Sequence, residues 1–190
     1  MPETLVSAPA IEPVSLAEAK AHLRLEDDAE DALVEAAITA ARLYVERATR
    51  RALIAQGWRV FLDAWPASRI VDIPIAPLIA VDAVTVYDED GEATVMEAEA
   101  YQVDAVSVPG RLRLIGTAPA PGQALNGIAI DVTAGHGEAA EDVPAPLRQA
   151  ILQLIAHWHE NRSATTSDRT TVIAPLGVDA LIAPYRVLAL

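Results

Sequence analysis

Residues 15–53 read SLAEAKAHLRLEDDAEDALVEAAITAARLYVERATRRAL, and this stretch determines the helical half of the predicted fold. Ser15 and Glu18 have the S-x-x-E spacing of a capping box, which predicts a helix start. After the acidic run at 26–28, apolar residues recur at helical spacing, with acids in the first turn and arginines in the last, as the helix dipole favours. We therefore predict helices over about residues 15–25 and 29–51.

The second of these helices is rich in alanine along its apolar side. Small side chains allow a neighbouring helix to approach closely, because the distance between packed helices depends on the side chains at the contact. The expected core-facing stripe consists of Leu33, Ala37, Ala40, Ala41, Tyr44 and Ala48, widened by Ile38 and Val45.

From residue 57 the apolar pattern changes from helical to alternating. Trp58, Val60 and Leu62 alternate with their neighbours as in a half-buried strand. Further short apolar runs follow, separated by proline and glycine, and residues 88–91 (DEDG) have the composition of a hairpin turn. This pattern predicts an antiparallel β-rich region over about residues 57–133.

A third helix is predicted over about residues 146–162, because Pro146 suits a first helical turn. Its apolar stripe has i, i+4, i+7, i+8, i+11 spacing and consists of Leu147, Ile151, Leu154, Ile155 and Trp158. Residues 164–171 are then rich in Ser and Thr, and the chain that follows is apolar again. This tail either packs on its own bundle or docks on a partner, and the sequence leaves both alternatives open.

The predicted fold class is therefore α+β, a small helical bundle with an inserted antiparallel β-rich region and an extended C-terminal tail. We expect a single domain over residues 1–190. The expected parts are a helical core (15–56 and 143–163), a β-rich elaboration (57–134), and a flexible link with a C-terminal arm (164–190).

The composition excludes several functional classes. A hydrophobic fraction of 52% over 190 residues is ample for a buried core. The absence of cysteine excludes disulfide frameworks and thiolate metal sites. A net charge of −13 opposes non-specific binding to nucleic acid. We expect no membrane-spanning segment and no signal peptide, because no apolar run is long enough and the N-terminus has no basic region.

No residue pattern points to catalysis, a cofactor or a metal. His157 and His159 are two apart on a predicted helix, so they cannot chelate one ion as an i, i+4 pair can. Residues 135–137 (GHG) lack the serine of a nucleophile elbow. Residues 88–91 lack the remaining ligand spacing of a calcium loop. We expect no catalytic, cofactor-binding or metal-binding residue, and hence no enzyme.

The order of motifs along the chain resembles that of the phage head–tail connector (adaptor) family. Its Ala-rich style is similar to versions in alphaproteobacterial prophages and gene transfer agents. One departure is Arg50-Arg51, where many relatives have glycine after Thr. The motifs that carry the resemblance are residues 15–25, AAITAARLYVERATRRAL at 36–53, YQV at 101–103, TAGHG at 133–137, VPAPLRQA at 143–150, HWHENR at 157–162, PLGV at 175–178 and LIAPYR at 181–186.

This resemblance implies a structural protein of the virion or virus-like particle neck, assembled in the bacterial cytoplasm. Adaptors of the family form a ring, usually of twelve copies, beneath the portal. The ring extends the DNA channel and presents a platform for stopper or tail proteins, and DNA passes through it without specific binding. The implied partners are therefore the portal, a stopper or other neck protein, and copies of the chain itself.

Two groups of residues are candidate contact sites under this resemblance. The C-terminal segment of such adaptors commonly docks on the portal, and the acidic turns are candidates for the channel wall. The candidate docking residues are Pro175, Leu176, Val178, Leu181, Ile182, Pro184, Tyr185, Arg186, Leu188 and Leu190. The candidate channel-facing acids are Glu26, Asp27, Asp28, Asp88, Glu89 and Asp90.

Two other readings of the sequence remain open. One is a different neck or tail-completion protein of similar build, which partner symmetry would distinguish. The other is a small acidic hydrolase or carbohydrate-binding module that uses the sheet. A pocket with convergent titratable groups would favour that second reading.

Overall fold

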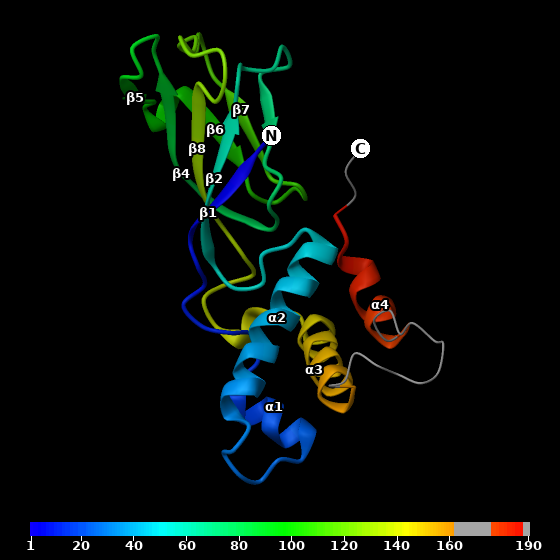
Figure 1. Cartoon of the computed structure of the whole chain (residues 1–190). Coiled ribbons are helices and arrows are strands. Elements are labelled where there is room, and N and C mark those ends of the chain that lie inside the picture. The colour runs from blue at the N-terminus through cyan, green and yellow to red at the C-terminus, as the bar shows by residue number, and fades with distance from the viewer. Residues whose placement is uncertain (162–175, 188–190) are drawn as a thin grey trace, which may run out of the picture. The chain divides into compact units, whose positions relative to one another are not determined.

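The computed structural model describes residues 1–161 and 176–187, which form two compact units (Figure 1). The β unit comprises Met1–Ala10 and Ala55–His136, and the helical unit comprises Ile11–Ile54 and Gly137–Leu190. The described residues form four α-helices and two antiparallel sheets, which confirms the predicted α+β class. None of the described helices is long and apolar enough to cross a membrane.

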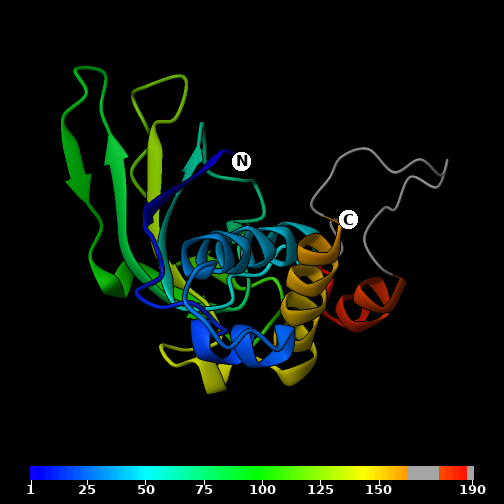
Figure 2. The ribbon, with the colours of Figure 1, turned by 60° about the horizontal axis from the view of Figure 1, so that its bottom comes forward.

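The helical unit contains α1 (Leu16–Leu23), α2 (Asp31–Thr49), α3 (Ala145–Glu160) and α4 (Leu176–Ile182), with short 3₁₀ turns at Ala140–Asp142 and Ala183–Tyr185. Figure 2 shows these four helices gathered into one bundle, with α4 in red beside α3 in gold. The three predicted helices are all present and end within two residues of the predicted bounds.

Left-handed residues end the first two helices. Arg24 caps α1 with φ 59° and Arg50 caps α2 with φ 56°, and the N–H of Arg50 donates to the Glu46 carbonyl. Glycine adopts this conformation at no steric cost, whereas a residue with a Cβ is strained there. Arg50 thus ends α2 in a conformation that a glycine would adopt without strain.

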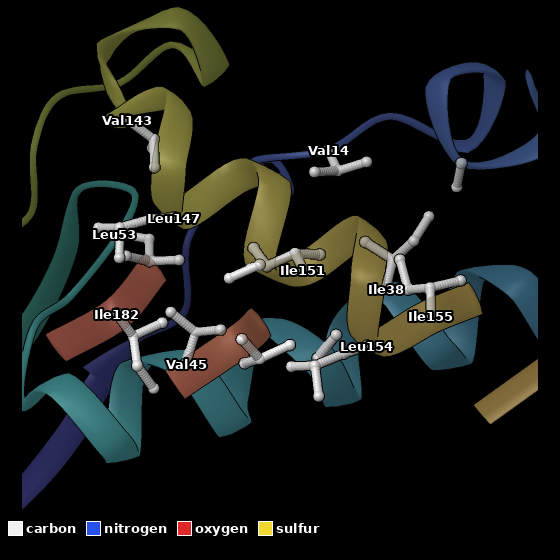
Figure 3. Close-up of a cluster of buried hydrophobic side chains, with 14 of the residues drawn as sticks. Val14, Ile38, Val45, Leu53, Val143, Leu147, Ile151, Leu154, Ile155 and Ile182 are labelled. Carbon is white, nitrogen blue, oxygen red and sulfur yellow. The ribbon is translucent and has the colours of Figure 1, made fainter. Parts of the chain in front are cut away.

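The core of the helical unit is built on α3 (Figure 3). Leu147, Ile151, Leu154 and Ile155 are each at most 1% exposed and confirm the predicted stripe. They face Ile38 and Val45 of α2 and Ile182 of α4. Full burial of an aliphatic side chain of this size stabilises a fold by roughly 1.5 to 3 kcal/mol.

The prediction for the core-facing stripe of α2 was wrong in part. Leu33 is 51% exposed and Tyr44 is 36% exposed, and Ala40 is also exposed. Apolar residues occur all round this helix, so periodicity alone does not determine which side faces the core. The buried side consists of Val34, Ile38, Ala41, Arg42, Val45 and Thr49.

A buried arginine fixes the orientation of α2. The Arg42 side chain is 8% exposed; its Nε donates to Glu12 Oε2 at 2.7 Å, and its Nη1 donates to Glu46 Oε2 at 2.8 Å. Thr39 Oγ1 donates to the other Glu12 oxygen at 2.9 Å, and the Leu53 N–H donates to the other Glu46 oxygen at 2.9 Å. The two carboxylates raise the pKa of Arg42 against the opposing effect of burial. This network ties the chain before α1 and the chain after α2 to the middle of α2.

We predict that Arg42→Met destabilises the protein by about 2 to 4 kcal/mol, because the variant leaves two carboxylates close together without their cation. The measurement is urea unfolding at neutral pH. The matched control is Arg47→Met on the same helix, since Arg47 is exposed and has no ion pair among the described residues. The control should change stability by less than about 0.5 kcal/mol. Equal effects of the two substitutions would contradict the structural role of Arg42.

The predicted capping box at the start of α1 is present. The Glu18 N–H donates to Ser15 Oγ at 3.2 Å, and the Ser15 N–H donates to Glu18 Oε2 at 3.0 Å. Arg148 of α3 also donates to the Glu18 carboxylate, and its Nε donates to the Pro13 carbonyl at 3.0 Å. The bond from the Ser15 N–H, together with Arg148, holds the pKa of Glu18 below its usual value of 4.5.

This lowered pKa predicts a pH dependence. A carboxylate whose pKa falls on folding contributes stability that is complete above its unfolded pKa and is lost as the pH falls through its folded pKa. Between about pH 5 and pH 3, the wild-type chain should therefore lose more stability than Glu18→Gln, which keeps a capping side chain without the charge. The measurement is the urea midpoint of both proteins across this range. If the urea midpoints of the two proteins fall in parallel across this pH range, the prediction is wrong.

The β unit contains two sheets. The larger has the strand order β1-β2-β8-β4-β5 and the smaller has the order β3-β7-β6, with all pairs antiparallel. A short 3₁₀ turn at Ala98–Ala100 precedes β6. The strands are β1 (Glu3–Ser7), β2 (Gln56–Leu62), β3 (Ile70–Asp72), β4 (Leu78–Tyr87), β5 (Ala93–Val95), β6 (Tyr101–Asp104), β7 (Arg111–Leu114) and β8 (Ile128–Ala134).

Strand β1 was not predicted from the sequence. It pairs with β2 at the edge of the larger sheet, and all five of its residues are exposed (Figure 1). Because neither face of β1 is buried, its sequence has no alternation of apolar and polar residues for a pattern to detect. The central strand β8, in contrast, is almost wholly buried.

Candidate partner-binding surfaces

The described part of the C-terminal tail packs on its own bundle. Val178 and Ile182 of α4 are 0% exposed and belong to the core of the helical unit, and Leu181 and Tyr185 pack against that core. Of the two alternatives left open by the sequence, residues 176–187 therefore follow the one in which the tail covers its own bundle. Val178 and Ile182 are not available to a partner while α4 is in place.

Polar contacts also tie this segment to the end of α2. Arg51 Nε donates to the Tyr185 carbonyl at 2.6 Å, and the Val187 N–H donates to the Thr49 carbonyl at 2.9 Å. Burial lowers the pKa of Arg51 from its usual value, as expected for a guanidinium that is partly removed from water. Arg51, which follows the left-handed residue at the end of α2, thus holds the C-terminal segment against that helix; we call this hydrogen bond to the Tyr185 carbonyl the Arg51 clamp.

The other candidate docking residues lie on the outside of this segment or beyond it. Pro184 and Arg186 are exposed, and Arg186 Nη2 pairs with Asp179 at 2.9 Å. The backbone of Leu176 begins α4. Pro175, Leu188 and Leu190, with the Ser/Thr-rich link at 164–171, lie outside the described residues. Any partner contact made with α4 in place therefore uses the outer side of the segment.

We predict that Ile182→Ala destabilises the helical unit by about 2 to 4 kcal/mol, because it leaves a cavity under α4. The control is Pro184→Ala, which removes exposed atoms from the same segment and should have an effect below about 0.5 kcal/mol. Urea unfolding measures the stability of each variant. An Ile182→Ala variant as stable as the wild type would show that α4 is not part of the core in solution.

The first acidic candidate group, residues 26–28, forms the connection from α1 to α2. All three side chains are exposed. Asp28 pairs with Lys20 at 2.6 Å, which lowers the pKa of Asp28 and raises the pKa of Lys20. Asp27 Oδ1 accepts the Ala29 N–H at 3.1 Å. Two of these acids therefore also have local structural partners, and the Glu26 side chain is exposed beside them.

The second acidic group, residues 88–90, forms the turn between β4 and β5. Asp88 Oδ1 accepts the N–H groups of Asp90 at 3.0 Å and Glu92 at 2.9 Å, while Gly91 takes φ 83°. Asp88 therefore closes the turn with its side chain. The carboxylates of Glu89 and Asp90 point to no partner within the described residues, and both are exposed. The two acidic groups belong to different units of the chain.

The histidines on α3 have structural neighbours. His159 Nε2 lies 2.9 Å from Glu30 Oε2, which joins the end of α3 to the start of α2. His157 lies beside Asn161 at the end of the helix, with its Nδ1 3.3 Å from Asn161 Nδ2. Within residues 1–161 and 176–187, no three His, Asp or Glu side chains are arranged to hold a metal ion.

The smaller sheet carries an open hollow of about 500 Å³, lined in part by Asp104, Arg111 and Arg113. Arg111 Nη2 pairs with Asp104 at 2.6 Å, and Ser107 Oγ donates to the same carboxylate at 2.7 Å. These groups hold the pKa of Asp104 far below its usual value. Glycoside hydrolysis needs a pair of carboxyl groups, one of which keeps its proton near neutral pH. This hollow has one carboxylate, fully ionised and already bonded, so it does not favour the hydrolase reading.

Comparison with known proteins identifies relatives over nearly the whole chain. The family model described as phage gp6-like head-tail connector protein matches residues 13–109 and 120–186. A chain in the neck of an empty gene transfer agent (GTA) particle, computed with C6 symmetry, is 30% identical with a TM-score of 0.85. A chain in the neck of a native GTA particle, computed with C12 symmetry, is 29% identical with a TM-score of 0.75.

Each of these two alignments covers 100% of this chain and 97% of the other chain. A third similar chain, 30% identical with a TM-score of 0.82, belongs to the virion of a native GTA particle. No curated protein sequence matches the chain. These similarities confirm the family that the order of sequence motifs indicated, and they extend over both the helical unit and the β unit.

Proposed function

The chain belongs to the phage gp6-like head-tail connector family, and we propose that it acts as the adaptor ring between the portal and the rest of the neck. In this role it is a structural protein and not an enzyme. Both units act together as one adaptor domain. Copies assemble in the bacterial cytoplasm into a ring that extends the DNA channel and presents a platform for a stopper or tail protein.

The observation that carries this proposal is the full-length likeness to chains in particle necks. A TM-score of 0.85 with 100% coverage at 30% identity means that the likeness extends over the whole chain, the helical unit and the β unit alike. Those necks were computed with C6 and C12 symmetry, which supports a ring of identical subunits. The family model, described as a head-tail connector protein, favours the adaptor over the alternative of another neck or tail-completion protein.

The charge of the chain supports passage of DNA without binding. A net charge of −13 repels the phosphate backbone, and an adaptor channel must release DNA as readily as it admits it. Exposed acids in both units are available to line such a channel. We assign this role to the groups at 26–28 and 88–90, whose side chains are exposed at turns.

Portal docking is proposed for the outer side of the C-terminal segment together with the residues that follow it. Pro184 and Arg186 are exposed there, while Val178 and Ile182 hold α4 on the bundle. In this arrangement Val178 and Ile182 hold the segment in place. The portal contact is made by Pro184 and Arg186 together with Leu188 and Leu190. Docking then requires no opening of the helical unit.

The test is co-expression with the candidate portal, followed by pull-down and electron microscopy. We expect a ring of this chain on the portal, with the acids of residues 26–28 or 88–90 at the channel wall. A chain ending at Val187 keeps α4 and should fold normally, but it should lose portal binding. The control for folding is its urea midpoint, which should match that of the full chain.

The possible outcomes separate the parts of the proposal. If the full chain binds no portal, the adaptor assignment is wrong and another neck or tail-completion role replaces it. If the shortened chain still forms a ring on the portal, the adaptor assignment stands and the docking role of the C-terminal residues is wrong. If the acids lie away from the channel in the reconstruction, their assignment alone is wrong.

A further inference from the structure

Helix α2 has a second apolar side, directly opposite the one that packs in the core. Its residues are spaced by three and four along the helix, so they form one continuous face. Leu43 is 52% exposed and Tyr44 is 36% exposed. The outward face of α2, as we define it, consists of Ala32, Ala36, Ala40, Leu43 and Tyr44, all exposed.

The outward face carries no acidic residue. The acids of α2 are Asp31, Glu35 and Glu46, and at 100° per residue each falls outside the outward face. At its C-terminal end the face adjoins Arg47 and Arg50, which are exposed and have no ion pair among the described residues. A protein with 27 acidic and 14 basic residues thus exposes one helix side that carries no acid.

Such a helix is not expected on the surface of a free-standing protein. A surface helix normally places polar residues opposite its core side, and a helix that is apolar on both sides is usually buried on both. An exposed apolar face of this kind marks a surface that another molecule covers. Copies of one acidic chain repel each other, so a face without acids is where two copies approach at the lowest electrostatic cost.

A second, different apolar surface lies in the same unit. A hollow of about 80 Å³ opens between α1, α2 and α3, with a lining that is almost entirely apolar. The lining includes Leu23 of α1, the exposed Leu33 at the start of α2 and the half-buried Trp158 of α3. The hollow lies at the Leu33 end of α2, two to three turns from Leu43 and Tyr44. One apolar side chain from outside would fill it.

Two unlike patches are what a ring requires. Neighbours in a cyclic ring of more than two copies meet head to tail, so each copy contributes one patch to the neighbour on one side and a different patch to the neighbour on the other. We propose that in the assembled ring the outward face of α2, led by Leu43 and Tyr44, packs against the hollow of the next copy. This inference rests on the proposed ring and names the surfaces that form it.

The absence of cysteine from the chain makes a direct test possible, because an introduced thiol is the only one present. The variants are Leu43→Cys on the outward face, Leu23→Cys in the hollow, and the two combined. The control is Leu125→Cys, at a loop position of the β unit that is 71% exposed. Each variant is expressed in place of the natural chain in cells that produce the particles, and particles are purified.

Thiol labelling is compared between the isolated chain and the particle. Reactivity of a thiol follows its exposure, so the label at position 43 should enter about tenfold or more slowly in the particle than in the isolated chain. The label at position 125 should change by less than about twofold. Reaction of the double variant with a short bifunctional thiol reagent should give a ladder of chain multiples on a denaturing gel. The single variants should give none.

Three results would overturn the inference. A thiol at position 43 that reacts as fast in the particle as in the isolated chain means that the face is uncovered. Protection at position 43 with cross-links only to another protein means that the portal or a stopper covers it. Cross-linked dimers from the Leu43→Cys variant alone mean that the face meets its own copy and not the hollow. If mass spectrometry finds no chain in the particles, the proposed function itself is wrong.

Discussion

The ion network at Arg42 is the constraint on which the helical unit depends. A cation held at 8% exposure is stable only while both carboxylates stay beside it, and these come from Glu12 before α1 and Glu46 within α2. Glu46 also accepts the Leu53 N–H, which fixes the exit of the chain toward the β unit. One side chain therefore fixes the segment that enters the bundle and the segment that leaves it. The apolar core around it consists of aliphatic side chains without an aromatic residue among its described buried members, and the network adds a directional contact that such side chains do not provide.

The same network explains why α2 turns one of its two apolar sides inward. Ile38, Ala41 and Val45 share the Arg42 side of the helix, so burial of the ion pairs carries them into the core. Leu33, Leu43 and Tyr44 would be equally acceptable core residues by hydrophobicity, but rotation of α2 to bury them would expose Ile38 and Val45 and break the contact with Glu12. The Arg42 network thus decides which side of α2 is buried, and the proposed contact with the next copy gives a reason for the apolar residues on the other side.

The competition between apolar burial and ion pairing on α2 shows which features of the fold the sequence could predict. Local signals were reliable where one physical requirement acts alone, as in the capping box at Ser15 and Glu18 and in the single apolar stripe of α3. The apolar pattern did not predict the core side of α2, because this helix has two apolar sides and the ion pairs of Arg42 determine which one is buried. The pattern also missed β1, because neither face of that strand is buried. The acidic turns were found as turns, but the roles of Asp28 and Asp88 as local hydrogen-bond acceptors required coordinates. The clamp from Arg51 to the Tyr185 carbonyl spans 134 residues, and no local pattern contains it.

The position of α4 changes how a docking tail can work in this protein. A tail that leaves its own bundle to bind a partner must first expose Val178 and Ile182 and the core beneath them, at a cost of several kcal/mol by ordinary burial energies. A tail that stays in place avoids this cost, because its buried residues already order it before the partner arrives. The Arg51 clamp and the bond from the Val187 N–H to the Thr49 carbonyl also order the backbone up to residue 187. A partner that docks on the segment as it stands does not have to expose this core, which favours docking on a preformed segment over docking by release.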